Sequence, residues 1–271
     1  LVAKAAPSVP PVLMANTGFV ACRSPKHPIS IAIINAAKVP IAAPSANKFG
    51  HVSPTRSHHV WDDLQNEDVW IVEELQEQEG SSCCEVGVES SVAKVEMYAS
   101  GTASAFDANK KGRITLLRQG LVSIENIRDC LEKAGLVDDF DVLAQTKTAT
   151  DEKVANIAPG QTVRHYSPNI PSFIISERLC NLATTSNQPE TSDSDREFLS
   201  SSVLIDFGGR LKTWQNLSLA YRDLSVAASS SEATKGVFEA LRWAEQIKHA
   251  KQILFPEILD DQMEQQYGSS S

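Results

Sequence analysis

Apolar and polar positions alternate in short blocks over the first 135 residues, and the blocks switch between the strand period and the helix period. Residues 17–22 and 39–43 are short apolar runs that predict buried strands. Between them, Pro28 opens a segment whose apolar residues recur at helical spacing: Ile29, Ala32, Ile33 and Ala36. Strands that alternate with helices in this way predict an α/β fold.

A polar turn, PSANKFGHVSPT, follows the second apolar run, and a second helix is predicted to begin near Pro54. Ser53 is expected to be the N-cap of that helix, because Pro54 at the first helical position loses no hydrogen bond. Further strands are predicted over 86–95 and 114–117. A third helix is predicted from Ser123 to Gly135.

Residues 136–172 contain no long periodic element and predict a linker. Beyond it, three short apolar runs predict strands at 173–175, 203–207 and 217–221. A stretch rich in Ser, Thr, Asp and Glu around 181–200 predicts disorder, and residues 232–249 predict an amphipathic helix. We therefore expect a domain over 1–135, a linker over 136–172, and a small, incomplete α/β domain over 173–271.

The amino-acid composition indicates a protein with a hydrophobic core and argues against several other classes of protein. A hydrophobic fraction of 42% is sufficient for a core, and no apolar run reaches the roughly 18 residues that would span a membrane. The net charge of −9 argues against a general nucleic-acid coat, although residues 1–48 are basic and leave room for an anionic ligand. Five cysteines without a CxxC pair favour reduced thiols, and hence the cytoplasm. Because the chain opens on Leu1, its natural N-terminus is expected to lie upstream.

The segment from Ala43 to Asn47 follows an apolar run, at the carboxyl end of a predicted strand, where open α/β sheets tend to bind ligands. Its small hydroxyl and amide groups can donate to carboxylate or phosphate oxygens. The helix start near Ser53 would add free N–H groups and a favourable dipole. Two such elements favour a phosphate-rich ligand, but ordinary turn and capping residues explain them on chemistry alone rather better.

Two further phrases carry charged or hydroxyl groups next to apolar runs. Glu89-Ser90-Ser91 places polar groups inside a predicted strand, where they must be paired within the protein or directed at a ligand. Arg118 ends a predicted strand before Gly120, a position that suits a phosphate contact. A surface salt bridge explains Arg118 equally well.

The predicted linker contains Arg164-His165-Tyr166 between two prolines. Three large functional side chains in a loop gain little from packing, and a tyrosine there can cover a base or a ribose. His58 and His59 are adjacent on the second predicted helix. We interpret them as a solvated helix face rather than a metal pair, and no metal-ligating residue is predicted.

In this order, the phrases resemble the threonylcarbamoyl-AMP synthases, the YrdC-domain proteins, in their longer form with a second domain. VPIAAPSANKFGHVSPT is similar to the strand-SAN-turn-SPT phrase of that family, VGVESSVAKV to its GxEST strand, LLRQG to its LRxG turn, and APGQTVRHYSP to its linker motif. The resemblance implies a YrdC-like twisted mixed sheet with helices, incomplete at the N-terminus. It also implies a smaller, Rossmann-like α/β domain at the C-terminus.

The resemblance implies an activity as well. The family condenses L-threonine, bicarbonate and ATP, with Mg2+, into threonylcarbamoyl-AMP and pyrophosphate, and downstream transferase machinery places the group on the tRNA adenosine beside the anticodon. By position, Arg23, Ser45 and Ser90 would bind threonine. The nucleotide would be contacted by Asn47, Ser53, Arg118 and Tyr166. No general base is assigned, and a direct contact with tRNA or other RNA stays open.

The sequence departs from the family in two places. A Lys-x-Arg motif that contacts the triphosphate in the family would precede Leu1, so we expect an N-terminally truncated chain that is inactive, or nearly so, on its own. The strand motif reads ESS rather than EST, which keeps the hydroxyl.

Two alternative functions stay open. One is a carbamoyltransferase that forms a carbamoyl-adenylate, and the other is a non-catalytic module that binds double-stranded RNA or tRNA. The RHY linker and the second domain argue against the transferase. The acidic charge, and the lack of aromatic residues interleaved with basic ones, argue against the RNA-binding module.

Overall fold

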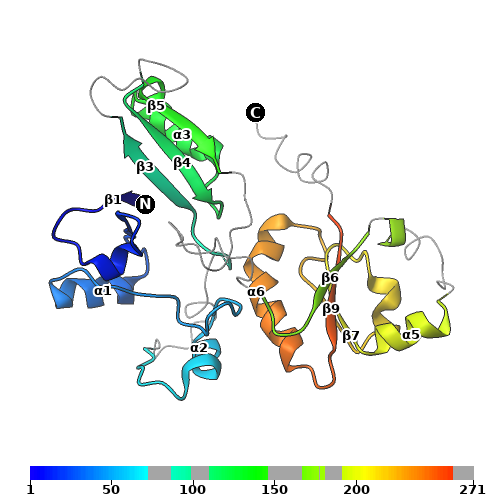
Figure 1. Cartoon of the computed structure of the whole chain (residues 1–271). Helices are drawn as coiled ribbons and strands as arrows, with labels where there is room; N and C mark the ends of the chain where they lie inside the picture. Colours follow the sequence, from blue (N-terminus) through cyan, green and yellow to red (C-terminus); the bar gives the residue numbers. More distant parts are fainter. Residues whose placement is uncertain (73–86, 99–109, 146–166, 177, 181–190, 259–271) are drawn as a thin grey trace. The chain divides into compact units, whose positions relative to one another are not determined.

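The computed structural model describes residues 1–72, 87–98, 110–145, 167–176, 178–180 and 191–258 (Figure 1). The chain forms two compact units, and each unit combines two separate stretches of sequence. The first contains Leu1–Ser45 and Glu89–His165, and the second contains Ala46–Val88 and Tyr166–Ser271. The SAN phrase is therefore divided, because Ser45 belongs to the first unit and Asn47 to the second.

The first unit is built on a five-stranded mixed sheet, as the α/β prediction requires. β1 pairs antiparallel with β2 and parallel with β3, β3 pairs antiparallel with β4, and β4 pairs parallel with β5. In the order across the sheet, the strands are β2 (Phe19–Ala21), β1 (Val2–Lys4), β3 (Val92–Met97), β4 (Gly112–Arg118) and β5 (Phe140–Ala144). The strands predicted at 17–22 and 114–117 are confirmed.

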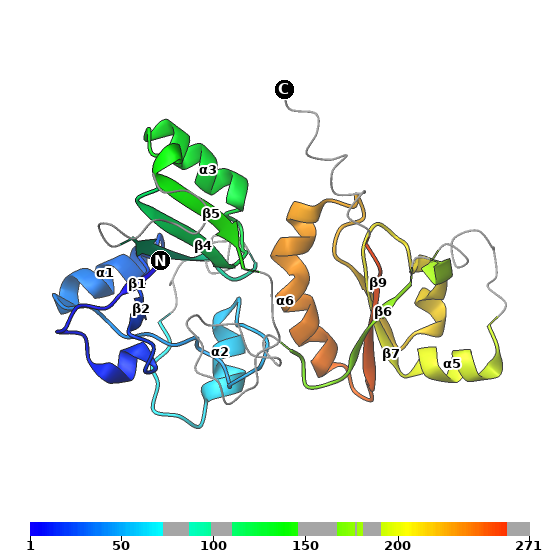
Figure 2. The same ribbon diagram turned by 45° about the horizontal axis from the view of Figure 1, so that its top comes forward.

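Two α-helices belong to this unit, α1 (Pro28–Ala37) and α3 (Ile124–Lys133), with short 3-10 helices η1 (Pro11–Met14) and η2 (Val137–Asp139). α3 lies against the sheet near β5, as both views show (Figures 1 and 2). Ser123 is its N-cap, and Gly135 follows its end with a φ of +67°, a conformation that suits glycine. Both helices predicted for this part of the chain are confirmed.

Two strand predictions and one part of the predicted linker need correction. Val39–Ala43 is exposed extended chain rather than a buried strand, because it pairs with no strand among the described residues. The strand predicted over 86–95 begins only at Val92, so Glu89-Ser90-Ser91 precedes the strand instead of lying inside it. β5 lies in the stretch interpreted as a linker, and its pairing with β4 is the interaction that makes it a strand.

The second unit is built on a four-stranded parallel sheet, which fits the predicted Rossmann-like α/β domain. Its strands, in order across the sheet, are β6 (Ser172–Ile175), β9 (Gln252–Pro256), β7 (Ser202–Asp206) and β8 (Ala220–Asp223). The first, third and fourth were predicted from apolar runs, and β9 was not. Its helices are α2 (Ser57–Leu64), α5 (Asp193–Ser200), η3 (Lys212–Leu217) and α6 (Ser230–Gln246).

The prediction of disorder over 181–200 is wrong for its second half, which forms α5. Ser192 caps this helix through a reciprocal pair of hydrogen bonds with Asp195, and Leu199 is its buried residue. The polar composition of this segment therefore did not predict α5, in which Leu199 is the buried residue. Residues 181–190 lie outside the described residues.

The core of the second unit includes a residue from the first half of the chain. Val52 is fully buried and packs with Val203, Ala240 and Ile253. α6 lies beside the parallel sheet (Figure 2), and its Leu241 and Ala244 belong to this core, as the predicted apolar stripe requires. The loop and helix that follow the SAN phrase therefore fold as part of the second unit. The domain boundaries predicted at residues 135 and 172 stay a prediction, since residues 146–166 lie outside the described residues.

Candidate functional site

The end of β4 and the segment before β3 bring together residues from two of the sequence phrases. Arg118 Nε donates to the main-chain carbonyl of Ser90 at 2.9 Å, and Arg118 Nη2 lies 3.4 Å from the Ser90 hydroxyl. The same nitrogen lies 3.5 Å from a carboxylate oxygen of Glu89. Because β3 and β4 are antiparallel, with Val92 opposite Arg118, the start of one strand and the end of the other lie side by side.

Ser91 fixes the turn that follows Arg118. Its hydroxyl accepts from the N–H groups of Gly120 and Val122, both at 2.9 Å, and donates to the carbonyl of Val122 at 2.7 Å. This side chain therefore uses its full hydrogen-bonding capacity within the protein. The third position of the ESS phrase needs a hydroxyl for structural reasons, which either Ser or Thr can supply.

This cluster combines a cation with an exposed hydroxyl. The Arg118 side chain is 12% exposed and that of Glu89 25%, whereas Ser90 is exposed. Glu89 and the Ser90 carbonyl hold the guanidinium in place, and the exposed Ser90 hydroxyl, which accepts from Arg118 Nη2, can still donate to a ligand. Such an arrangement suits an anionic group bound at the strand ends.

Arg23 and Ser45, the other predicted threonine ligands, belong to the same unit but are solvent-exposed. Across the described part of the chain, no hydrogen bond or ion pair joins either of them to Ser90. The structure thus assembles Ser90 with Arg118, and does not assemble Arg23 or Ser45 with that pair.

Asn47 and Ser53 lie in the second unit, on the loop before α2. The helix begins at Ser57, so Ser53 is not its N-cap, and Arg56 occupies that position instead. Ser53 is buried, at 6% exposure, and precedes Thr55, whose N–H donates to the ring of His59 at 3.2 Å. The N–H and the hydroxyl of Thr55 both contact His59 Nδ1. Such local hydrogen bonds compete with helix formation, and α2 begins only at Ser57.

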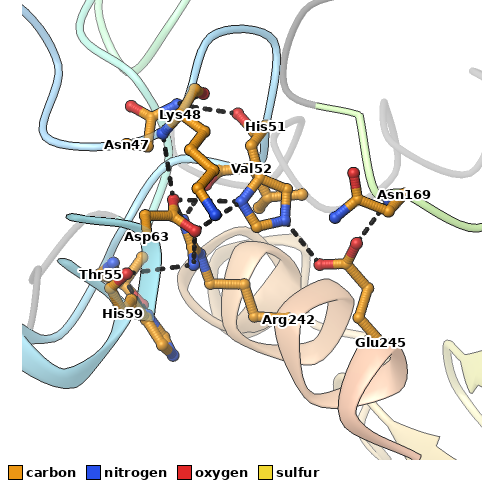
Figure 3. A network of polar contacts seen from close by, with 10 residues as sticks. All are labelled: Asn47, Lys48, His51, Val52, Thr55, His59, Asp63, Asn169, Arg242 and Glu245. Atoms are coloured by element: carbon orange, nitrogen blue, oxygen red, sulfur yellow. Dashed lines mark hydrogen bonds and ion pairs between the residues drawn. The ribbon is translucent and has the colours of Figure 1, made fainter. Parts of the chain in front are cut away.

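Asn47 closes a tight turn. Its side-chain amide donates to the carbonyl of Lys48 at 2.9 Å and to that of His51 at 3.1 Å (Figure 3). Its Oδ1 is buried and has no hydrogen-bond partner among the described residues. A buried acceptor of this kind is costly unless something pairs with it.

A network of buried polar groups supports this turn (Figure 3). Arg242 of α6, only 4% exposed, donates to Asp63 Oδ2 at 2.8 Å and also to the carbonyl of Val52. The ring of His51 lies between two carboxylates, with Nδ1 at 3.0 Å from Asp63 and Nε2 at 2.8 Å from Glu245. The second oxygen of Glu245 accepts the Asn169 N–H at 2.5 Å.

Burial and neighbouring charges shift the pKa values of two groups in this network, His59 and Asp63. Burial, together with the neighbouring His58 ring and the Arg242 guanidinium, lowers the pKa of His59 from 6.5 to about 4. Burial alone would raise the pKa of Asp63, but hydrogen bonds from Arg242 and His51 outweigh it and lower that pKa. His59 is therefore neutral and Asp63 ionised near neutral pH. The interpretation of both histidines as a solvated face is wrong for His59, which is buried, whereas His58 is exposed.

Tyr166, with the rest of the RHY phrase, lies outside the described residues. The chain next to it is described: the Ser167 N–H donates to the carbonyl of Gly50 at 3.1 Å. Ser167, which follows Tyr166 in the sequence, is therefore hydrogen-bonded to the loop that carries Asn47.

Sequence reasoning missed four residues of this site, namely His51, Asp63, Arg242 and Glu245. His51 is separated from Glu245 by 194 positions, and Asp63 from Arg242 by 179. No local signal marked these residues, because Arg242 lies off the predicted apolar stripe of its helix and its burial is visible only in the structure.

Within the described ranges, no group of three or more His, Cys, Asp or Glu side chains could hold a metal ion. A search of the same residues finds no helix long and apolar enough to cross a membrane.

Two family models match the chain. The model described as "Telomere recombination" matches residues 1–103, and the model described as "Threonylcarbamoyl-AMP synthase, C-terminal domain" matches residues 122–268. Together they cover both units.

Curated relatives are named threonylcarbamoyl-AMP synthase. The Schizosaccharomyces pombe protein is 32% identical over 168 residues, which is 62% of this chain and 35% of that protein. The Bacillus subtilis protein is 32% identical over 164 residues, with coverages of 60% and 39%, and the Pyrococcus abyssi protein is 28% identical over 167 residues, with coverages of 62% and 41%. The matched part thus spans well under half of each relative.

Solved structures of P. abyssi Sua5 share the fold. The complex with L-threonine superposes with a TM-score of 0.69 at 22% identity, and covers 96% of this chain and 64% of that one. A structure of a doubly substituted P. abyssi Sua5 gives 0.65 at 20% identity, with the same coverages. The similarity extends over both units. Because the C-terminal model alone matches more than half of the chain, and the relatives that match carry the same name, the protein belongs to the two-domain threonylcarbamoyl-AMP synthase family.

Proposed function

We propose that the protein acts as an L-threonylcarbamoyladenylate synthase. The observation that carries this proposal is the cluster in which Arg118 contacts Glu89 and Ser90, because it joins a fixed cation to an exposed hydroxyl at the ends of β3 and β4. Both groups suit a reaction in which a carboxylate-bearing amino acid meets a nucleotide phosphate. The membership of the family supports the same activity, and the P. abyssi structure binds L-threonine.

The proposed reaction has two steps. The threonine amine first attacks bicarbonate, and a carbamate forms with loss of water. A carbamate oxygen then attacks the α-phosphorus of ATP, so that a C–O–P linkage forms, the bond to the β-phosphate breaks and pyrophosphate leaves. This chemistry depends mainly on positioning and on charge stabilisation, so we assign no general base.

Within this proposal, Ser90 binds threonine and Arg118 stabilises phosphate charge from the same cluster. Arg23 and Ser45 would join the threonine site. Asn47 would offer the nucleotide its Oδ1, which has no partner among the described residues, with Ser53 on the same loop, and Tyr166 would cover the nucleotide. Mg2+ would enter with ATP, because this ion is commonly held by substrate phosphates and water rather than by a protein cage.

The proposed product would be consumed by an enzyme that transfers the threonylcarbamoyl group to the tRNA adenosine beside the anticodon. We also propose a cytoplasmic location, which the free thiols of Cys22 and Cys130 support. Direct contact with RNA is an additional proposal that only a binding experiment can test.

Pyrophosphate release tests the proposed activity. The chain of 271 residues and the longest reading frame that contains it are each mixed with ATP, Mg2+, bicarbonate and one amino acid at a time. We expect release that requires both threonine and bicarbonate and that falls at least about a hundredfold in Arg118→Ala, since a charged phosphate contact is lost. Arg128→Ala, which removes an exposed arginine of α3, is the matched control and should retain activity.

Two results would contradict the proposal. Release that proceeds with carbamoyl phosphate in place of threonine and bicarbonate would indicate a carbamoyltransferase. No release from either chain, together with tight and salt-dependent binding of RNA, would indicate a binding module.

A further inference from the structure

Two charged residues of α6 point at the loop that carries Asn47. Arg242 and Glu245 are three positions apart, so they share one face of the helix (Figure 3). Both belong to the part of the chain matched by the C-terminal family model, whereas the loop belongs to the part matched by the N-terminal model. Loop and helix nevertheless form a single compact unit.

Arg242 fixes the end of the loop. Its guanidinium is 4% exposed and donates to Asp63 at 2.8 Å, to the carbonyl of His59 at 3.3 Å, and to the carbonyl of Val52. A buried cation is tolerated only when it is paired and hydrogen-bonded, so each of these contacts holds the loop in one place. The fully buried Val52 reinforces this anchor through the apolar core.

Glu245 fixes the other side of the loop. One carboxylate oxygen pairs with His51 Nε2 at 2.8 Å, and the other accepts the Asn169 N–H at 2.5 Å. The Ser167 N–H adds a second link, to the carbonyl of Gly50. A single carboxylate on α6 thus hydrogen-bonds both to the loop that carries Asn47 and to the segment that contains Asn169.

The orientation of Asn47 depends on these anchors. Its side chain donates to the carbonyl of His51, the residue that Glu245 and Asp63 hold. The neighbouring Lys48 N–H donates to Asp63 at 3.3 Å. Movement of His51 or Asp63 would therefore displace the amide whose Oδ1 is left unpaired among the described residues.

We propose that Arg242 and Glu245 of the C-terminal domain are positioning residues for the nucleotide, acting through His51 and Asp63 on Asn47. The second domain then completes the nucleotide-binding turn and sets its geometry. This inference rests on the proposed function, because it takes Asn47 as a nucleotide ligand. It predicts an effect on ATP that is separate from threonine, since the predicted threonine ligands belong to the other unit.

Glu245→Gln is the most informative variant, because it keeps the size of the side chain and removes its charge. Glu197→Gln makes the same chemical change at an exposed position of α5 and is the matched control. Calorimetric titrations with ATP·Mg2+ and, separately, with L-threonine are carried out on the longest reading frame that contains this sequence. Hydrogen exchange of the Lys48 and Asn169 amides reports on the turn independently of any ligand.

We expect Glu245→Gln to weaken ATP binding about tenfold and to leave threonine binding within about twofold, because only the turn loses a charged hydrogen bond. The Asn169 amide should exchange about tenfold faster than in the control. A merely structural role would shift the melting temperature without separating the two ligands.

Three outcomes would overturn the inference: unchanged exchange, faster exchange with unchanged ATP affinity, or an equal loss of affinity for both ligands. If the unsubstituted protein binds no ATP, the proposed function itself has failed and the inference falls with it. If the unsubstituted protein binds ATP and Glu245→Gln binds it equally well, only the inference fails.

Discussion

Gly120 is a position where one added methyl group would collide with the backbone. A Cβ there would lie 2.2 Å from the carbonyl oxygen of Glu89 and 2.7 Å from the nitrogen of Ser91. We expect Gly120→Ala to lower the free energy of unfolding by about 1–3 kcal/mol, as overpacking does, and to displace Ser90 from Arg118. Urea unfolding measures the first effect.

Gly236, inside α6, provides the control, because its added Cβ would meet only Leu224 at an ordinary 3.7 Å. Gly236→Ala should leave stability unchanged or raise it by about 0.5–1 kcal/mol through helix propensity. Equal stabilities of the two variants would contradict the close approach at Gly120.

Burial of His59 predicts a dependence of stability on pH. The folded pKa of about 4 lies below the unfolded value of 6.5, so the unfolded chain binds the extra proton between these two values. The stability contributed by neutral His59 is complete above about pH 6.5 and is lost as the pH falls toward 4. The difference between the folded and unfolded pKa values corresponds to a loss of at most about 3 kcal/mol in the free energy of unfolding.

Urea unfolding at a series of pH values between about 4 and 7 measures this loss. His59→Gln should remove most of the slope, whereas His249→Asn, at an exposed position with a φ of +71°, should retain it. Equal slopes in both variants would show that another group is responsible.

At the scale of the element, α3 illustrates how local chemistry determines a helix. The Ser123 hydroxyl accepts the N–H of Asn126, and the Asn126 side chain accepts the N–H of Ser123. Ser123→Ala should lower the free energy of unfolding by about 1 kcal/mol, measured by chemical denaturation of the full chain. Ser123→Asp keeps an acceptor and should restore most of the loss, and a failure to do so would contradict the capping role.

Elements with strong local signals were predictable, and those that depend on a distant partner were not. Ser123 with Gly135, and the apolar stripe of α6, predicted helices that the structure confirms. Val39–Ala43 has the composition of a strand but pairs with none in the described part of the chain. β5 is short, follows the polar Asp138 and Asp139, and becomes a strand through its pairing with β4, so its sequence alone did not predict it.

At the scale of the whole molecule, each unit combines two stretches that are separated in the sequence. The Arg118 and Ser90 cluster was foreseeable in part, because Arg118 ends one predicted strand and Ser90 lies inside another. The network of His51, Asp63 and Glu245 was not, because nothing in the local pattern relates His51 to a residue 194 positions away. Composition predicts that a buried charge needs a partner but does not identify it.

The placement of Val52 tests this organisation. Val52→Ala removes apolar contact from a fully buried position and should cost the second unit about 2 kcal/mol. Hydrogen exchange of amides in β7 and β9 measures the loss. Val69→Ala, at an exposed position, should change stability by less than about 0.5 kcal/mol. Unchanged exchange in β7 and β9 would show that the loop does not belong to that core.

The identity of the reaction product tests the central claim most directly. The longest reading frame containing this sequence is incubated with Mg2+, ATP labelled in its adenine, 14C-bicarbonate and 3H-threonine, and the nucleotides are separated by chromatography. The account predicts one adenylate that carries all three labels in equal amounts and that forms in step with pyrophosphate. An adenylate without either the bicarbonate or the threonine label, or no labelled adenylate at all, would contradict it.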